Sequence, residues 1–181
     1  MSFDPAPVRA CTRCALAATR THVVVGSGAL DARLLVIGEA PGRDEDEQGA
    51  PFVGRSGQLL FRLIAQEVGL AREDCYVTNT LKCRPPGNRV PTGDELAACR
   101  PWLEAQRAES GAAVTLVVGL TAAREVLGAT LPMGRIHGRP RHLGASAGLA
   151  TYHPAAALRN PEIVDVMRAD LRVVAALLGS A

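Results

Sequence analysis

Short, uninterrupted apolar runs are the clearest feature of the chain. They lie at residues 34–37, 75–78, 114–118 and about 148–152. A run of this length without polar alternation is typical of a strand that is buried on both faces of a sheet. The pattern therefore predicts four strands in the middle layer of the fold.

Between these runs, apolar residues recur at the spacing of amphipathic helices. Gly69 follows the first stripe as a helix C-cap, and Thr92 with Glu95 has the spacing of a capping box. Pro101 should kink the helix that this box opens, because it removes one backbone hydrogen bond. The predicted helices cover residues 59–68, 93 onward, 121–127 and 161–178.

Strands that alternate with helices predict an α/β fold, since each helix crosses from one parallel strand to the next. The expected architecture is a three-layer α/β/α sandwich with a central four-stranded parallel sheet. Residues 134–143 are expected to form a hairpin or an irregular stretch. With no linker, repeat or low-complexity tract, the chain is expected to be one domain over residues 1–181.

The ends of the predicted strands indicate where a functional site should lie. In open α/β sheets, ligands bind outside the carboxyl ends of the strands. Those ends lead here into polar or glycine-rich turns at 38–42, Asn79, 119–121 and His153. We therefore expect these four turns to meet at one edge of the sheet.

Composition adds little to this picture. A hydrophobic fraction of 48% is ordinary for a globular protein, and a net charge of +2 neither requires nor excludes nucleic acid as a partner. No apolar stretch is long enough for a membrane span, and the N-terminus lacks the pattern of a signal peptide. The expected location is the cytoplasm, without membrane attachment.

Five cysteines in a reducing compartment are more often ligands or core residues than disulfides. Cys11 and Cys14 form a CxxC pair, and Cys83 and Cys99 follow at longer spacing. Four such thiols fit a zinc site or a [4Fe–4S] cluster, and spacing alone cannot separate these two. Cys83 and Cys99 also fit a plain core role, which is the interpretation for Cys75 at the head of a strand.

The long loop after the first strand carries most of the candidate chemistry. It reads GEAPGRDEDEQGAPFVGRSGQLL over residues 38–60. It contains neither a P-loop nor a GxGxxG fingerprint, which disfavours nucleotide binding by those routes. Glu39 directly follows the strand and should lie at the working edge of the sheet.

Three segments of the chain resemble motifs of the iron–sulfur (family four) uracil-DNA glycosylases. The first is the loop at 38–60, the second is NTLKCRPPGNRVP at 79–91, and the third is TYHPAAALRNP at 151–161. The motifs occur in the family's order, and Cys11, Cys14, Cys83 and Cys99 fall at its cluster positions. The similarity extends from about residue 11 to residue 178.

This resemblance implies hydrolysis of the N-glycosidic bond of deoxyuridine in DNA, single- or double-stranded, with uracil and an abasic site as products. It implies a [4Fe–4S] cluster on the four cysteines, a monomer, and no lyase activity or covalent DNA complex. Two other classes remain as alternatives. One is a metal-stabilised DNA-binding module without activity, and the other is a Mg²⁺-dependent hydrolase of free nucleotides that uses the acidic loop.

The resemblance also implies residue roles. Asn79 should read the uracil edge, His153 should bond to uracil O2, and Phe52 should stack on the flipped base. Glu39 should position the water, with Asp44 or Asp46 in its place if it does not. The backbone positions expected around uracil are Gly38, Ala40 and Gly42.

DNA contacts are expected around the same loops. Leu158 and Arg159 resemble a wedge that fills the space of the flipped nucleotide. Basic side chains close to the motifs should contact phosphates, although charged loops are more often merely solvated. These residues are Arg55, Lys82, Arg84 and Arg89.

Overall fold

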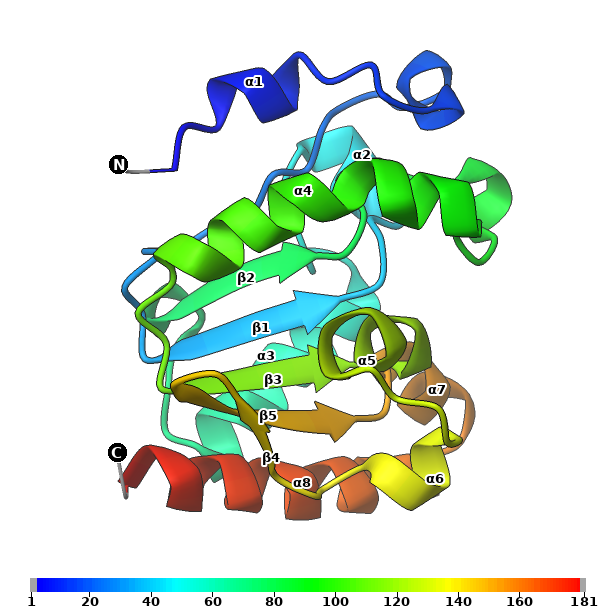
Figure 1. The fold of residues 1–181 in the computed structure, drawn as a ribbon. Helices are drawn as coiled ribbons and strands as arrows, with labels where there is room; N and C mark the ends of the chain where they lie inside the picture. The colour runs from blue at the N-terminus through cyan, green and yellow to red at the C-terminus, as the bar shows by residue number, and fades with distance from the viewer. Residues whose placement is uncertain (1–2, 180–181) are drawn as a thin grey trace.

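We describe a computed structural model of the chain over residues 3–179. This part of the chain folds around one five-stranded sheet with the strand order β2-β1-β3-β5-β4 (Figure 1). The strands are β1 (Leu34–Gly38), β2 (Cys75–Asn79), β3 (Val114–Val118), β4 (Arg141–Leu143) and β5 (Ser146–Thr151). All four predicted strands are present and parallel to one another.

The fifth strand, β4, was not predicted as part of the sheet. It pairs antiparallel with β5 at the sheet edge, so the prediction of four parallel strands is corrected to five strands of mixed direction. Arg141 and His142 are exposed, and the strand is held by backbone pairing with β5 and by the packing of Leu143 on the second face. A three-residue strand with one apolar residue has no apolar run, and its sequence therefore carried no strand signal.

Helices cover both faces of the sheet, which confirms the three-layer architecture (Figure 1). The side chains of Leu34 and Val36 pack on one face, and those of Leu35 and Ile37 pack on the other. The main helices are α3 (Arg55–Glu67), α7 (Pro154–Arg159) and α8 (Glu162–Gly179) on the first face, and α4 (Gly93–Glu109) and α5 (Leu120–Leu127) on the second.

Several short helical elements were not predicted from the sequence. They are α1 (Ala6–Arg9), η1 (Ala15–Ala18), α2 (Arg43–Gln48), η2 (Arg72–Asp74), η3 (Pro86–Asn88) and α6 (Met133–Ile136). The segment with α1 and η1 packs over the start of α4 and the strand-end loop at 81–83, in a third apolar cluster. This cluster brings the N-terminal CxxC pair to Cys83 and Cys99.

The helix ends follow their local sequence. Thr92 caps α4 as predicted, since its hydroxyl accepts from the Glu95 amide at 3.3 Å and Glu95 accepts from the Thr92 amide at 2.8 Å. The helix runs without interruption through Pro101 to its last residue. Among residues 3–179 we find no helix with the length and apolar character to cross a bilayer.

The central strand should dominate stability. Leu116 on β3 is fully buried, so Leu116→Ala should lower the free energy of unfolding by about 2–5 kcal/mol, measured by denaturant titration. The control is Leu131→Ala, because Leu131 is 50% exposed and its loss should change stability by less than about 0.5 kcal/mol. Equal effects of the two substitutions would contradict this account of the core.

Candidate active site

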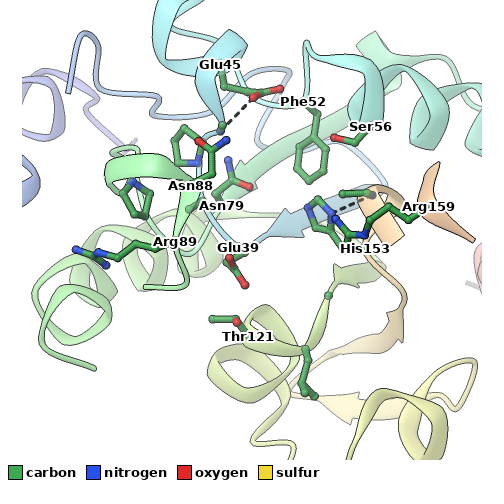
Figure 2. A pocket seen from close by; sticks show the side chains of 17 residues that line it. Glu39, Glu45, Phe52, Ser56, Asn79, Asn88, Arg89, Thr121, His153 and Arg159 are labelled. Atoms are coloured by element: carbon green, nitrogen blue, oxygen red, sulfur yellow. Dashed lines mark hydrogen bonds between the residues drawn. The ribbon is translucent and has the colours of Figure 1, made fainter. Parts of the chain in front are cut away.

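The carboxyl ends of the four parallel strands open into one cavity of about 460 Å³ (Figure 2). Glu39 follows β1, Asn79 ends β2, Gly119 follows β3 and His153 follows β5. The predicted site residues in its wall are Glu39, Ala40, Gly42, Phe52, Asn79, Arg89, His153 and Arg159. The four turns therefore meet at one edge of the sheet, as expected.

Gly38 makes room for two side chains at the end of β1. It pairs in register with Asn79 on β2. A Cβ at Gly38 would lie 2.4 Å from Cζ of Phe52 and 2.5 Å from Oδ1 of Asn79. A side chain at this position would therefore displace both the ring and the carboxamide from the cavity.

Asn79 presents an uncommitted carboxamide. The residue is 2% exposed, and Figure 2 shows its side chain directed into the cavity between Phe52 and Glu39. Within residues 3–179 no hydrogen bond holds this carboxamide, although the Asn79 carbonyl accepts from Lys82 Nζ at 2.6 Å. One donor and one acceptor are thus free to bind a ligand that offers the opposite pair.

His153 has a defined tautomer. Its Nδ1 accepts a hydrogen bond from the Ala155 amide at 3.2 Å, which leaves the proton on Nε2. Burial lowers the pKa of His153 to about 4, although the nearby Glu45 carboxylate acts in the opposite direction. At neutral pH the ring is therefore an uncharged Nε2–H donor at the wall of the cavity.

Phe52 forms the apolar side of the cavity. Its ring stacks on that of His153 at 6.3 Å between centroids, with an interplanar angle of 27° (Figure 2). It also meets Phe61 edge to face at 6.4 Å. A flat, aromatic ligand would find a matching face here, next to the two polar groups described above.

The carboxylates of the acidic loop differ in position. Glu39 lines the cavity, and Figure 2 shows its side chain between Asn79 and Thr121. Asp46 is buried and accepts from the backbone amides of Thr21 and His22, so it does not reach the cavity. Asp44 is also absent from the cavity wall, so of the three acidic residues considered for a water-positioning role only Glu39 lines the cavity.

Glu45 is a cavity residue that the sequence did not single out. Its carboxylate accepts from the Gly42 amide at 3.1 Å and from the Gly54 amide at 2.9 Å. It thereby joins the two ends of the loop that carries Phe52. Ser56, Asn88 and Thr121 also line the cavity and were not predicted as contacts, although all lie in turns or motifs that pointed to this edge.

The position of Lys82 contradicts its predicted role in DNA binding. It was expected to contact phosphate, but the residue is 1% exposed. Its ammonium donates to Thr78 Oγ1 at 2.7 Å, to the Asn79 carbonyl at 2.6 Å and to Gln106 Oε1 at 2.6 Å. Because three internal oxygens hold this ammonium, Lys82 stabilises the end of β2 and cannot reach a DNA backbone.

The other predicted DNA-contacting residues lie on the surface around the cavity. Arg55 and Leu158 are exposed, and Leu158 is one of the few exposed large apolar side chains among the described residues. Arg84 donates to Asn88 Oδ1 at 2.6 Å. Arg89 forms a two-pronged pair with Glu95, at 2.6 and 2.9 Å, so part of its charge is already neutralised.

Cys11, Cys14, Cys83 and Cys99 line a second cavity, which shares no residue with the first. Three of their sulfurs accept hydrogen bonds: from Trp102 Nε1 to Cys11 at 3.3 Å, from Arg20 Nη1 to Cys83 at 3.4 Å and from the Lys82 amide to Cys99 at 3.3 Å. Among residues 3–179, no three Cys, His, Asp or Glu side chains converge closely enough to ligate a single metal ion.

Comparison with known proteins agrees with this geometry. Residues 25–174 match the family model of the uracil DNA glycosylase superfamily. That match covers both the strands and the three loops that build the cavity. The chain therefore belongs to the uracil DNA glycosylase superfamily.

Individual relatives narrow the assignment. A type-4 uracil-DNA glycosylase of Thermotoga maritima is 44% identical over 84% of this chain and 80% of its own length. A type-4 enzyme of Saccharolobus solfataricus is 39% identical over 96% of this chain and 84% of its own. A type-5 uracil-DNA glycosylase of Pyrobaculum aerophilum is 31% identical over 71% of this chain. The chain is a member of the type-4 family.

The protonation of His153 can be measured directly. We expect its ring to remain neutral, with the proton on Nε2, from pH 7 down to about 5, because its pKa is lowered to about 4. Nitrogen-detected NMR of the labelled imidazole, assigned by comparison with His153→Gln, measures this. A midpoint close to 6.5, the value of a free histidine, would contradict the buried, Nδ1-accepting arrangement.

Proposed function

We propose that this protein excises uracil from DNA by hydrolysis of the N-glycosidic bond. The observation that carries the proposal is the convergence of a free carboxamide, an Nε2–H donor and an aromatic face in one cavity, from Asn79, His153 and Phe52. Membership of the type-4 family supports the same reaction.

The cavity selects uracil through its hydrogen-bonding edge. The target nucleotide has to leave the base stack before it can enter. The Asn79 carboxamide then donates to uracil O4 and accepts from N3–H, whereas cytosine presents the reversed pair and leaves both groups of Asn79 unpaired. Phe52 stacks on the face of the base.

His153 stabilises the leaving group. As the C1′–N1 bond breaks, its electron pair moves onto uracil, and negative charge grows on O2. The neutral Nε2–H of His153 donates a hydrogen bond to that oxygen without first transferring a proton. Because the pKa of His153 is lowered to about 4, its ring can act as this neutral donor at neutral and mildly acidic pH.

Glu39 orients the attacking water. Its carboxylate accepts a hydrogen bond from the water, whose oxygen forms the new bond to C1′ of the sugar, and the released proton passes to the carboxylate or to solvent. The absence of Asp44 and Asp46 from the cavity wall supports Glu39 in this role. Glu45 is already engaged by two backbone amides.

The sequence offers no accessible lysine amine for lyase chemistry. A glycosylase that also cleaves the backbone commonly forms a Schiff base between an amine and C1′. Lys82 is the sole lysine of the sequence, and its ammonium is buried among three oxygens. This supports a monofunctional enzyme that leaves an intact abasic site.

Contacts with the DNA surround the cavity mouth. Leu158 and Arg159 at the end of α7 fill the space of the flipped nucleotide, and Arg55 and Arg84 contact phosphates. We further propose that the enzyme acts as a monomer on uracil in single-stranded or double-stranded DNA.

The second cavity fits a [4Fe–4S] cluster held by Cys11, Cys14, Cys83 and Cys99. Four thiols line it, and N–H groups donate to three of the sulfurs, as is usual around cluster thiolates. These four residues would hold the cluster between the N-terminal segment, the loop at 81–83 and α4, and its role there would be structural.

Excision can be tested on a uracil-containing oligonucleotide in EDTA, with alkali to cleave the abasic product. Wild-type protein should release uracil, and Asn79→Ala and His153→Ala should each slow the single-turnover rate by about 100-fold or more. Glu39→Gln should slow it by about 10-fold or more, since the carboxamide lacks the negative charge and the basic oxygen that assist the water. His142→Ala, on the exposed strand β4, is the matched control and should retain full activity.

Absence of uracil release by wild-type protein would overturn the proposed function. A requirement for Mg²⁺, with activity on free nucleotides, would favour the nucleotide hydrolase instead. If Glu39→Gln alone keeps the wild-type rate, the water role of Glu39 is wrong while the proposal for Asn79 and His153 stands.

Cluster binding can be followed by the fluorescence of Trp102. Trp102 is the sole tryptophan and donates to Cys11 Sγ, so its fluorescence should be quenched in the loaded protein and recover when iron is removed. The loaded protein should absorb near about 400 nm. Cys83→Ala should lose this absorption, whereas Cys75→Ala should retain it, because Cys75 lies outside the cavity. Stoichiometric zinc with no absorption would contradict the cluster.

A further inference from the structure

Phe52 holds an unusual backbone conformation. Its φ of 52° lies in the left-handed region, which residues with side chains seldom adopt. The close approach of Gly57 fits this turn, since a Cβ there would lie 2.0 Å from the Phe52 carbonyl oxygen. The same conformation directs the Phe52 ring over the end of β1 and against His153. A strained residue at a binding site needs other groups to hold it.

Arg72 is the group that holds this turn. It belongs to η2, just before β2, and its guanidinium donates from Nη1 to the Phe52 carbonyl at 3.0 Å and from Nη2 to the Pro51 carbonyl. Two consecutive carbonyls thus converge on one planar fork, a geometry that arginine provides and lysine does not.

The Arg72 guanidinium also packs on the aromatic pair Phe61 and Phe52. The guanidinium lies over the Phe61 ring at 4.5 Å from its centroid, and Phe61 in turn meets Phe52 edge to face. Among residues 3–179 no carboxylate forms an ion pair with Arg72. Its donors therefore serve the turn at 51–52 and not a surface salt bridge.

We propose that Arg72 is a positioning residue for uracil recognition: it fixes the left-handed turn that places the Phe52 ring against the base. This inference rests on the proposed function, because it assigns a role to the surface on which uracil stacks. Arg72 is absent from the wall of the cavity, so it acts through Phe52 and does not touch the base.

The test uses free uracil as a competitive product inhibitor in the oligonucleotide assay. Arg72→Met keeps the length and apolar contact of the side chain but removes both donors. It should weaken uracil inhibition and raise KM by about 10-fold, the scale of a lost base–aromatic stack, with kcat changed far less. Arg72→Lys, which keeps the charge, should fall between Met and wild type.

A double-mutant cycle separates positioning from general stabilisation. In a Phe52→Ala background, Arg72→Met should cause no further loss of uracil inhibition, because the ring that it positions is gone. Arg172→Met is the matched control: Arg172 pairs with Glu67 between α3 and α8, far in sequence from the turn, and its loss should leave uracil inhibition unchanged.

A second measurement follows the ring itself and does not depend on activity. The sequence contains three phenylalanines, so fluorophenylalanine labelling gives a three-line fluorine NMR spectrum in which Phe52→Leu identifies one signal. Arg72→Met should shift or broaden the Phe52 signal, and Arg172→Met should not.

The outcomes distinguish this inference from the proposed function. If wild-type protein neither excises nor binds uracil, the proposed function fails. If wild-type protein is active but Arg72→Met and Arg72→Lys keep its uracil inhibition and its Phe52 signal, the inference on Arg72 alone is wrong. It is equally wrong if Arg72→Met has the same effect with and without the Phe52 ring.

Discussion

The parallel register of β1 and β2 is the constraint on which the site depends. It sets Gly38 beside Asn79, so the carboxamide and the Phe52 ring share the space that a side chain at Gly38 would fill. Strands β3 and β5 run parallel to β1 and end at the same edge of the sheet, where they place the turns at Gly119 and His153. Sheet pairing therefore determines which polar groups meet, and the loops determine how they point.

Hydrogen bonds from residues outside or beside the cavity hold Asn79, His153 and the Phe52 loop in position. The buried ammonium of Lys82 holds the carbonyl of Asn79, the Ala155 amide selects the tautomer of His153, and Glu45 joins two amides of the Phe52 loop. Such preorganisation keeps the free groups aimed at the ligand.

The apolar runs and the turns at their ends were sufficient to predict the sheet, its two helical layers and the edge at which Glu39, Asn79 and His153 meet. Motif resemblance supplied the roles. What the sequence left out depends on three-dimensional neighbours: Lys82 reads as a surface cation until Gln106 and Thr78 are found around it. Asp46 and Glu45 are adjacent acids on the short helix α2. Only the packing of the fold shows that Asp46 accepts from backbone amides in the interior while Glu45 lines the cavity. Strand β4 has no apolar run, and its antiparallel pairing with β5 could not be predicted from its three residues.

A crystal structure of the protein soaked with uracil tests the central claim most directly. The account predicts uracil in the strand-end cavity, its N3–H and O4 paired with the Asn79 carboxamide, its O2 on Nε2 of His153 and its face on Phe52. Uracil bound elsewhere, or with its hydrogen-bonding edge turned away from Asn79, would contradict it.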